Sequence, residues 1–267
     1  RKQTLMEEKN MSRTADEVLT HHINAMMSMD FENAPSDYSK NLMAITRLDN
    51  RNRTLGYDSM ELIMQKGIKI TRWLPLNMEK MAKKLHTLFR CAVGEYVVYL
   101  AEMKPYSGFA CFNYIVHDDK AIYVTGYAKA PFLMPSIGIP PHPFVPGKET
   151  LAVMDVHLAH LREKNTAAML DDYAEDAIVI TNLSKQPFIG KKELLPYCEV
   201  QVGKASVHFS AIAGPDTGYL LKDTVAELGC IGFQQKKTRQ YGVLTQRVRN
   251  GKIIYESAIF KDAEAIL

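Results

Sequence analysis

The sequence lacks the signatures of several common protein classes. It holds only four cysteines in 267 residues, and none forms a C-x-x-C pair or a Cys/His spacing typical of zinc sites. No apolar run approaches the ~20 residues of a membrane span. The net charge is only +3, too small an excess for the concentrated basic surface of a nucleic-acid-binding protein. We therefore expect no metal site, no membrane partner and no nucleic-acid partner.

Motifs for nucleotide or nucleophilic chemistry are missing as well. The chain has no glycine-rich phosphate loop and no nucleophile elbow, so no cofactor is implied. We interpret the cysteines as reduced core thiols, which weakly favours a cytoplasmic location. The sequence does not begin with Met, which is typical of a chain that has lost a leader or an N-terminal piece.

What the sequence does contain is an internal repeat. Residues 21–46 (HHINAMMSMDFENAPSDYSKNLMAIT) align without a gap with residues 156–181 (VHLAHLREKNTAAMLDDYAEDAIVIT). His22 falls on His157, Tyr38 on Tyr173 and Thr46 on Thr181. A repeat of this length indicates a duplicated domain rather than a short solenoid unit.

A proline-rich segment separates the two copies. Residues 135–147 hold five prolines in their first twelve positions, and proline disfavours both helices and central strands. We predict domains at 11–134 and 147–267, joined by a linker at 135–146.

Each copy is predicted to begin with helices and to continue with strands. Thr14 and Glu17 form a T-x-x-E capping box for the first helix, and the segments LMAIT and AIVIT resemble strands. Later strands are expected at 95–103, 109–117, 121–129, 204–214, 218–229, 239–249 and 252–260. Asn250-Gly251 is a strong hairpin signal between the last two. The first copy has extra material at 66–90, where we expect an added amphipathic helix.

This order of elements predicts an α+β fold. Together with the phrases LDDYAEDAIVIT and VRNGKIIYES, it resembles the NTF2-like superfamily, and within it the SnoaL-like branch. The resemblance implies two cones, each with three helices packed in a curved antiparallel sheet around a small-molecule cavity. Because such domains commonly dimerise through their sheets, the tandem chain is expected to form an internal pseudo-dimer, and it leaves a further homodimer open.

The same resemblance bears on catalysis. Ketosteroid-isomerase-like members carry a general-base aspartate at the end of the first strand, where this chain has Thr46 and Thr181. Threonine is not a usable base near neutral pH, which disfavours that mechanism in either copy. The Asp-Arg-Asp arrangement of limonene epoxide hydrolases is not clearly present.

Other residues remain candidates for acid–base chemistry. His22 and His157 lie on the stripe of the first helix that can face the cone, and histidine titrates near neutral pH. The alternative is a core or interface histidine that is hydrogen-bonded to a backbone carbonyl. Tyr38 and Tyr173 could polarise a ligand carbonyl, but a packing role is the alternative. Glu102 and Asp223 fall at comparable places in a strand, where an inward carboxylate could pair with the histidine and an outward one would face the other domain or solvent.

The first copy is predicted to hold the main ligand site, because aromatic and methionine side chains concentrate there. The candidate ligand-binding residues are Met26, Trp73, Tyr99, Phe112 and Tyr114. Two functions stay open. One is a cofactor-independent cyclase, isomerase, dehydratase or epoxide hydrolase acting on an apolar oxygenated molecule, such as a polyketide or terpenoid. The other is a non-catalytic ligand-binding or scaffold protein.

Overall fold

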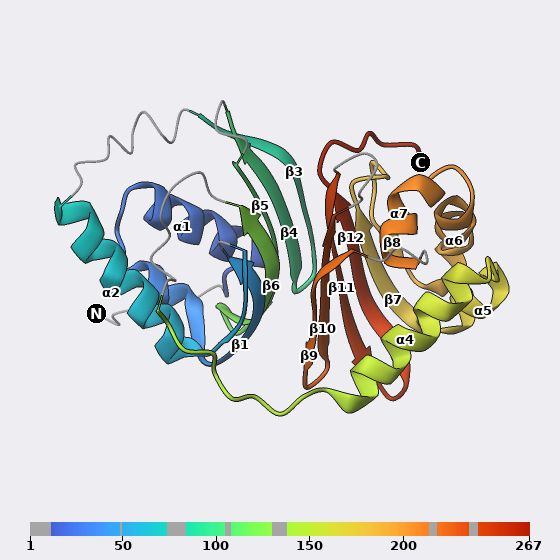
Figure 1. The fold of residues 1–267 in the computed structure, drawn as a ribbon, viewed down its shortest axis with the longest axis horizontal. Coiled ribbons are helices and arrows are strands. Elements are labelled where there is room, and N and C mark those ends of the chain that lie inside the picture. Colours follow the sequence, from blue (N-terminus) through green and yellow to red (C-terminus); the bar gives the residue numbers. More distant parts are fainter. Residues whose placement is uncertain are drawn as a thin grey trace, which may run out of the picture.

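The chain forms two units in which a curved sheet wraps around helices, and the two sheets face each other (Figure 1). The computed structural model describes residues 12–48, 50–73, 84–104, 108–129, 138–213, 218–234 and 240–267. The predicted α+β class is confirmed. Within these residues, no helix has the length and hydropathy needed to cross a membrane.

Unit one (residues 15–129) begins with helices and a short hairpin and ends with a four-stranded meander. Its elements are α1 (Ala15–Met27), the 3-10 helix η1 (Ala34–Asp37), β1 (Tyr38–Leu48), β2 (Arg51–Leu55), α2 (Tyr57–Trp73), β3 (Leu85–Val93), β4 (Tyr96–Met103), β5 (Gly108–His117) and β6 (Lys120–Lys129). The capping box forms, since the Glu17 amide donates to Thr14 Oγ1 at 3.2 Å and the Thr14 amide donates to Glu17 Oε2 at 2.7 Å.

Unit two (residues 148–260) repeats this order with more helix. Its elements are α4 (Lys148–Arg162), α5 (Thr166–Asp171), β7 (Tyr173–Thr181), β8 (Phe188–Ile189), η2 (Lys191–Glu193), α6 (Leu195–Val202), α7 (Ser206–Ala213), β9 (Tyr219–Val225), β10 (Leu228–Gln234), β11 (Tyr241–Arg249) and β12 (Lys252–Phe260). Asn250 and Gly251 both have positive φ, 52° and 70°, as the predicted hairpin turn requires.

The sheets are mixed, which corrects the antiparallel prediction. Their strand orders are β2-β1-β6-β5-β4-β3 and β8-β7-β12-β11-β10-β9. The pairs β1–β6 and β7–β12 are parallel, and all the other pairs are antiparallel. The parallel pair arises because each meander runs across the sheet and brings its last strand back beside the first.

Three predicted elements differ from the structure. Residues 206–213, expected in a strand, form α7, and Nδ1 of its His208 lies 2.6 Å from Gln240 Oε1. The expected strand at 218–229 is the β9–β10 hairpin. Residues 85–90, which were assigned to the insertion, form the first part of β3. Helix α2 continues to residue 73, so it includes the first residues of the insertion. The rest of the expected added helix lies outside the described residues.

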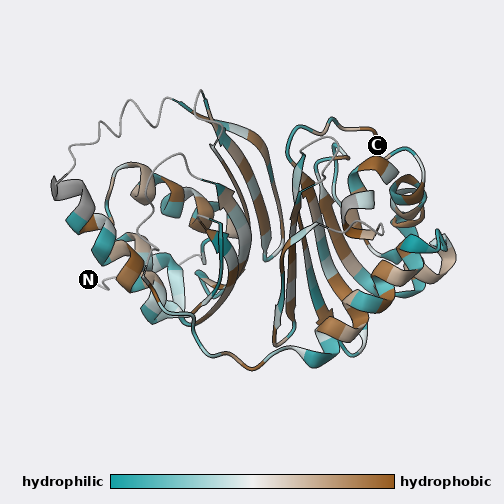
Figure 2. Cartoon of the chain, in the orientation of Figure 1, coloured by the Kyte–Doolittle hydropathy of each residue, from teal (hydrophilic) through white to brown (hydrophobic). Residues whose placement is uncertain are grey.

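The two sheets share one apolar cluster, which confirms the internal pseudo-dimer. Val98, Leu100 and Ile115 of unit one pack in the same cluster as Leu228 and Val243 of unit two. Hydrophobic residues run along the strands of both sheets (Figure 2). Burial of each sheet on both faces gives the interface the character of a core.

Directional contacts fix the register of this interface. The rings of Tyr96 and Tyr255 stack with centroids 4.0 Å apart. At its centre, the Asn113 amide donates to Thr245 Oγ1 at 3.1 Å. Arg247 bridges the units through a 2.6 Å contact from Nη1 to Glu95 Oε1. A slip of either sheet would leave these buried polar groups unpaired, at a cost of roughly 1–3 kcal/mol each.

The described part of the predicted linker lies against unit one. The His142 amide donates to the Thr54 carbonyl at 2.7 Å, and Arg53 Nη1 donates to the Ile139 carbonyl at 2.7 Å. Residues 135–137 lie outside the described residues. All four cysteines are free thiols, as predicted; Cys111, Cys198 and Cys230 are buried and Cys91 is half-buried.

Candidate functional site

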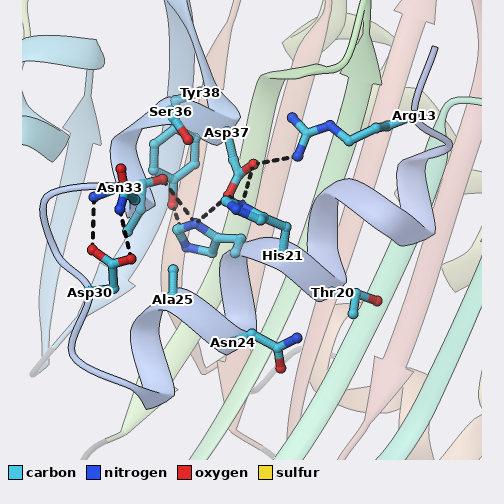
Figure 3. Close-up of polar contacts among 12 residues, drawn as sticks. Arg13, Thr20, His21, Asn24, Ala25, Asp30, Asn33, Ser36, Asp37 and Tyr38 are labelled. Atoms are coloured by element: carbon cyan, nitrogen blue, oxygen red, sulfur yellow. Dashed lines mark hydrogen bonds and ion pairs between the residues drawn. The ribbon is translucent and has the colours of Figure 1, made fainter. Parts of the chain in front are cut away.

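In unit one, a histidine and a tyrosine meet inside the cone. His22 lies on the inner face of α1, and Tyr38 begins β1 directly after η1. His22 Nδ1 is 3.4 Å from the Ala34 carbonyl, which can only accept, so Nδ1 carries a proton. Nε2 then accepts from the Tyr38 hydroxyl at 2.9 Å (Figure 3). The two predicted residues form one hydrogen-bonded unit.

The carboxyl group of Asp37 lies next to His22, near ring atom Nδ1. Its carboxyl group is 1% exposed and lies 3.0 Å from Arg13 Nη1, 2.8 Å from His21 Nδ1 and 3.7 Å from His22 Nδ1 (Figure 3). Burial opposes ionisation, but the hydrogen bonds from the two histidines and Arg13 outweigh it and lower the pKa of Asp37. The aspartate is therefore ionised near neutral pH and orients His22.

The tyrosines of the cone are neutral hydrogen-bonding groups. Burial, reinforced by neighbouring Tyr114 and Asp37, raises the pKa of Tyr38 well above its ordinary value. Burial likewise raises the pKa of Tyr114. The hydrogen bond between the Tyr114 and Tyr38 hydroxyls offsets a small part of this increase. Tyrosinate is therefore disfavoured, and both side chains can donate a hydrogen bond but cannot act as bases near neutral pH.

These polar groups line one side of a cavity of about 260 Å³. The volume is close to the ~300 Å³ lower end of ordinary ligand sites. The wall is mostly apolar, and its lining includes Met26, Met60, Ile63, Met64, Tyr99, Ala101, Met103, Ala110, Phe112, Val124 and Ala128. The cavity thus combines a hydrophobic body with a tyrosine–histidine group, here called the tyrosine end.

Sheet register explains where the space opens. Leu48 of β1 pairs with Ala128 of β6, Ala128 with Ala110 of β5, and Ala110 with Ala101 of β4. Three adjacent strands therefore present alanine at one level of the concave face. In unit two, α6 and α7 place Tyr197, Cys198, Phe209 and other buried side chains in the core of the cone.

Thr46 provides a further polar group on the cavity wall. Its hydroxyl is buried and has no hydrogen-bond partner among the described residues. The counterpart Thr181 differs, because its hydroxyl donates to the Ala258 carbonyl at 2.7 Å and accepts from the Leu183 amide at 3.2 Å. The two threonines occupy equivalent positions in the repeat but differ in their hydrogen bonding.

Unit two contains a charged core that the sequence analysis missed. Glu256 is 0% exposed, and its carboxylate accepts from the Tyr197 hydroxyl at 2.6 Å and from Gln246 Nε2 at 2.6 Å. His157 lies between two carboxylates, with Nδ1 2.8 Å from Asp172 Oδ2 and Nε2 3.7 Å from Glu256 Oε2.

Glu256 occupies the position that Val124 has in unit one. Ala44 pairs with Val124, and Val179, which is Ala44's counterpart in the repeat, pairs with Glu256. His157 consequently lies near Glu256, and the buried Tyr173 hydroxyl has no hydrogen-bond partner among the described residues. One valine-to-glutamate difference thus separates an apolar interior from an acidic one.

The remaining predicted site residues lie elsewhere. Glu102 is on the sheet face opposite the cavity, where it pairs with Lys104 at 2.8 Å beside an inter-unit groove. Asp223 shares the inter-unit face with Leu221, and its Oδ1 accepts from the Thr224 amide at 2.8 Å. Neither carboxylate approaches the helix-one histidine. Trp73 ends α2, but its side chain lies outside what the structure describes.

Comparison with known proteins finds similarity only among solved structures. No protein-family model matches the chain, and no curated protein matches it. A putative ketosteroid isomerase from Kribbella flavida is 12% identical, with a TM-score of 0.32 over 45% of this chain and 84% of that one. An NTF2-like protein of unknown function from Mesorhizobium loti is 15% identical, with a TM-score of 0.34 over 45% and 97%.

A third structure, an LEH-like epoxide hydrolase from M. tuberculosis, is 9% identical, with a TM-score of 0.31 over 43% of this chain and 84% of that one. Each match therefore spans about one unit of this chain. Identities and scores this low assign no activity to it.

Proposed function

We propose that unit one binds an apolar, oxygen-bearing small molecule in its cavity and that unit two serves as its structural partner. The observation that carries this proposal is the cavity of about 260 Å³ with apolar walls and buried hydroxyl groups. Such a combination of hydrophobic surface and a few fixed polar groups is typical of small-molecule sites.

The apolar walls would supply most of the affinity. A ligand that buries about 250 Å² of apolar surface gains roughly 6 kcal/mol at ~25 cal/mol per Å², before the cost of immobilisation. Methionines at 26, 60 and 64 can adjust to irregular shapes because their side chains are unbranched and flexible. Shape selection by this wall is therefore expected to be permissive.

The tyrosine end would recognise one neutral oxygen of the ligand. Tyr114 and Tyr38 stay protonated because burial raises the pKa of each hydroxyl. A ligand hydroxyl or carbonyl can accept a hydrogen bond from such a group, whereas a ligand anion would find, among the described residues at the tyrosine end, no cation other than a protonated His22. We therefore favour alcohols and ketones over acids.

A second candidate function is catalysis without a cofactor, by isomerisation, cyclisation, dehydration or epoxide opening. The specific observation in its favour is the line Asp37–His22–Tyr38, in which the 2.9 Å bond joins a titratable imidazole to a hydroxyl at the cavity. This requires His22 with a proton on both nitrogens, so that Nε2 donates to the Tyr38 oxygen and the Tyr38 hydroxyl is free to donate to the ligand. As Tyr38 gives its proton to a developing ligand oxyanion, the Nε2 proton would pass to Tyr38 and leave His22 neutral with its proton on Nδ1.

Binding can be tested with the neutral fluorescent probe N-phenyl-1-naphthylamine. Ala110→Leu places a larger side chain in the cavity wall and is expected to weaken probe binding by roughly tenfold, about 1.4 kcal/mol. Ala152→Leu, on the exposed face of α4, is the matched control and should bind as the unaltered protein does. Equal probe affinity in both variants would contradict the proposed location.

Catalysis needs a different readout. Exchange of the α-hydrogens of a bound cyclic enone with D2O, followed by NMR, reports enolisation directly. At saturating enone, Tyr38→Phe and His22→Gln should each slow the exchange by roughly a hundredfold, the scale of a general-acid contribution. The catalytic candidate fails if enones bind and none of them exchanges faster than in protein-free solution.

A further inference from the structure

Thr46 carries a buried hydroxyl group that has no hydrogen-bond partner in the part of the chain that the structure describes. Its residue is 1% exposed, its hydroxyl contacts no donor or acceptor among the described residues, and it lines the cavity. An unpaired buried hydroxyl is unfavourable, so such groups are uncommon in folded proteins. The matching Thr181 shows that the local backbone can satisfy a threonine at this position.

The direction of the Thr46 side chain follows from the strand alternation. Ala44 and Leu48, two residues away on either side, belong to the unit-one core, whereas Ile45 belongs to the cluster between the units. Thr46 therefore faces the concave side, with Gly126 as its neighbour on β6. A Cβ atom at Gly126 would lie 2.2 Å from the Phe112 ring, so glycine lets that ring lie across the sheet beside Thr46.

Thr46 and Tyr114 are separate points on the cavity wall. Thr46 pairs with Gly126, and Gly126 pairs with Phe112, two residues before Tyr114 on β5. Two strand spacings of about 4.8 Å and two residue rises of about 3.3 Å place the two Cα atoms roughly 12 Å apart on a flat sheet. The curvature of the sheet brings their side chains closer together over the cavity.

We infer that the ligand of this cavity carries two neutral oxygen functions on an apolar frame, one bound at the tyrosine end and the other at Thr46. This inference rests on the proposed binding function and adds a substrate class to it, namely diols, hydroxyketones and diketones. Thr46 is the specificity-determining residue for the second oxygen, because its hydroxyl can donate to a carbonyl and can also accept from an alcohol.

The charges around the cavity agree with neutral oxygens. Among the described residues that line the cavity, none is an aspartate or a glutamate, and Asp37 lies on the far side of His22. The ammonium group of Lys129, at the end of β6, is 3.4 Å from the Tyr241 hydroxyl of unit two, on the other face of the sheet. The second oxygen is therefore bound by a hydroxyl group and not by a charge.

The test uses two series of rigid probes. The first is biphenyl with no hydroxyl, with one terminal hydroxyl, or with one hydroxyl at each end. The second is the matching set of naphthalenes, which are shorter. Dissociation constants are measured by calorimetry. In the unaltered protein, the best-fitting probe with two hydroxyls should bind roughly five- to tenfold more tightly than the same frame with one. Thr46→Val should remove this advantage and leave the affinity for the one-hydroxyl probe unchanged.

Two further variants make the outcomes distinct. Thr181→Val is the matched control and should keep the advantage of the second hydroxyl, whereas Tyr114→Phe should weaken both hydroxylated probes. If one-hydroxyl probes bind but the second hydroxyl adds nothing, or if its advantage survives in Thr46→Val, the inference is wrong and the proposed function stands. If no probe of either series binds, the proposed function itself is wrong.

Discussion

Replacing the two equivalent threonines by valine should change stability in opposite directions. Valine keeps the branched shape of threonine and removes only the hydroxyl group. At Thr181, this deletes the donor to the Ala258 carbonyl and the acceptor for the Leu183 amide. At Thr46, it deletes a hydroxyl that has no partner among the described residues. Both residues are 1% exposed, so burial alone does not distinguish the two replacements.

The magnitudes follow from these contacts. In Thr181→Val, the amide of Leu183 is left buried and unpaired, which costs about 1–3 kcal/mol. In Thr46→Val, the penalty for burying an unpaired hydroxyl is relieved, and mutational data place that gain at about 1 kcal/mol or slightly more. The free energies of unfolding of the two variants should therefore differ by roughly 2–4 kcal/mol, with Thr46→Val the more stable.

Urea denaturation of ligand-free protein, followed by circular dichroism, measures this difference. Tyrosine fluorescence gives an independent probe of the same transition, because most of the 13 tyrosines of the chain lie in the strands and helices of the two units. A loss of stability in Thr46→Val equal to that in Thr181→Val would refute the reasoning, since it would mean that the Thr46 hydroxyl is already satisfied in the free protein.

Three other predictions concern the charged groups. The pKa values of Asp37 and Asp172 are both lowered, because histidine hydrogen bonds outweigh burial, so their stabilisation is present above the ordinary aspartate pKa of about 4 and is lost as the pH falls through the lowered pKa values. Asp37→Asn should therefore flatten the decrease in unfolding free energy below about pH 5. Arg247→Ala should destabilise the chain by about 2–3 kcal/mol because it removes charged hydrogen bonds across the interface, whereas Arg249→Ala, on an exposed pair, should cost under ~1 kcal/mol in the same denaturation assay. Glu256→Leu should cost at least ~2 kcal/mol, because Tyr197 and Gln246 lose their acceptor, and an unchanged melting temperature would contradict the described core of unit two.

The repeat made much of the architecture predictable. The ungapped alignment marked His22 and Tyr38 as separate candidates, although their hydrogen bond to each other was not predicted, and the Asn250-Gly251 turn located the last hairpin. These features depend on interactions between residues close in sequence, such as the positive φ angles at the turn or the side-chain cap at Thr14. Interactions of this kind can be predicted from a short stretch of sequence.

The missed features depend on burial of the sheets on both faces. In β12, both Tyr255, on the inter-unit face, and Glu256, inside the cone, are buried, so no alternation of polar and apolar residues marks the inner side. A register shift between Ile253 and Tyr255 obscures the pattern further. The one acidic residue of the final strand, Glu256, was the signal of an acidic interior.

Helix α7 was missed for a related reason. Its sequence SVHFSAIA is short and mostly apolar, and such a segment fits a buried strand as well as a buried helix. The positions of Glu102 and Asp223 required the strand register, because a shift of one residue moves a side chain from the cone to the interface. The hydrogen bonding of Thr46 cannot be read from sequence at all, since Thr181 is the same residue in the same repeat position.

The central claim is that a small molecule binds inside unit one and not inside unit two. Carbon-13 labelling of the methionine methyl groups tests it directly, because Met26, Met60 and Met64 line the cavity whereas Met154 and Met169 are buried in the core of unit two. Titration with singly hydroxylated biphenyl should shift the signals of Met26, Met60 and Met64, and those of Met27 and Met103, which also line the cavity, along one saturable curve, and should leave the two unit-two signals in place. Shifts confined to Met154 and Met169, or no saturable shift at any methionine, would contradict the claim.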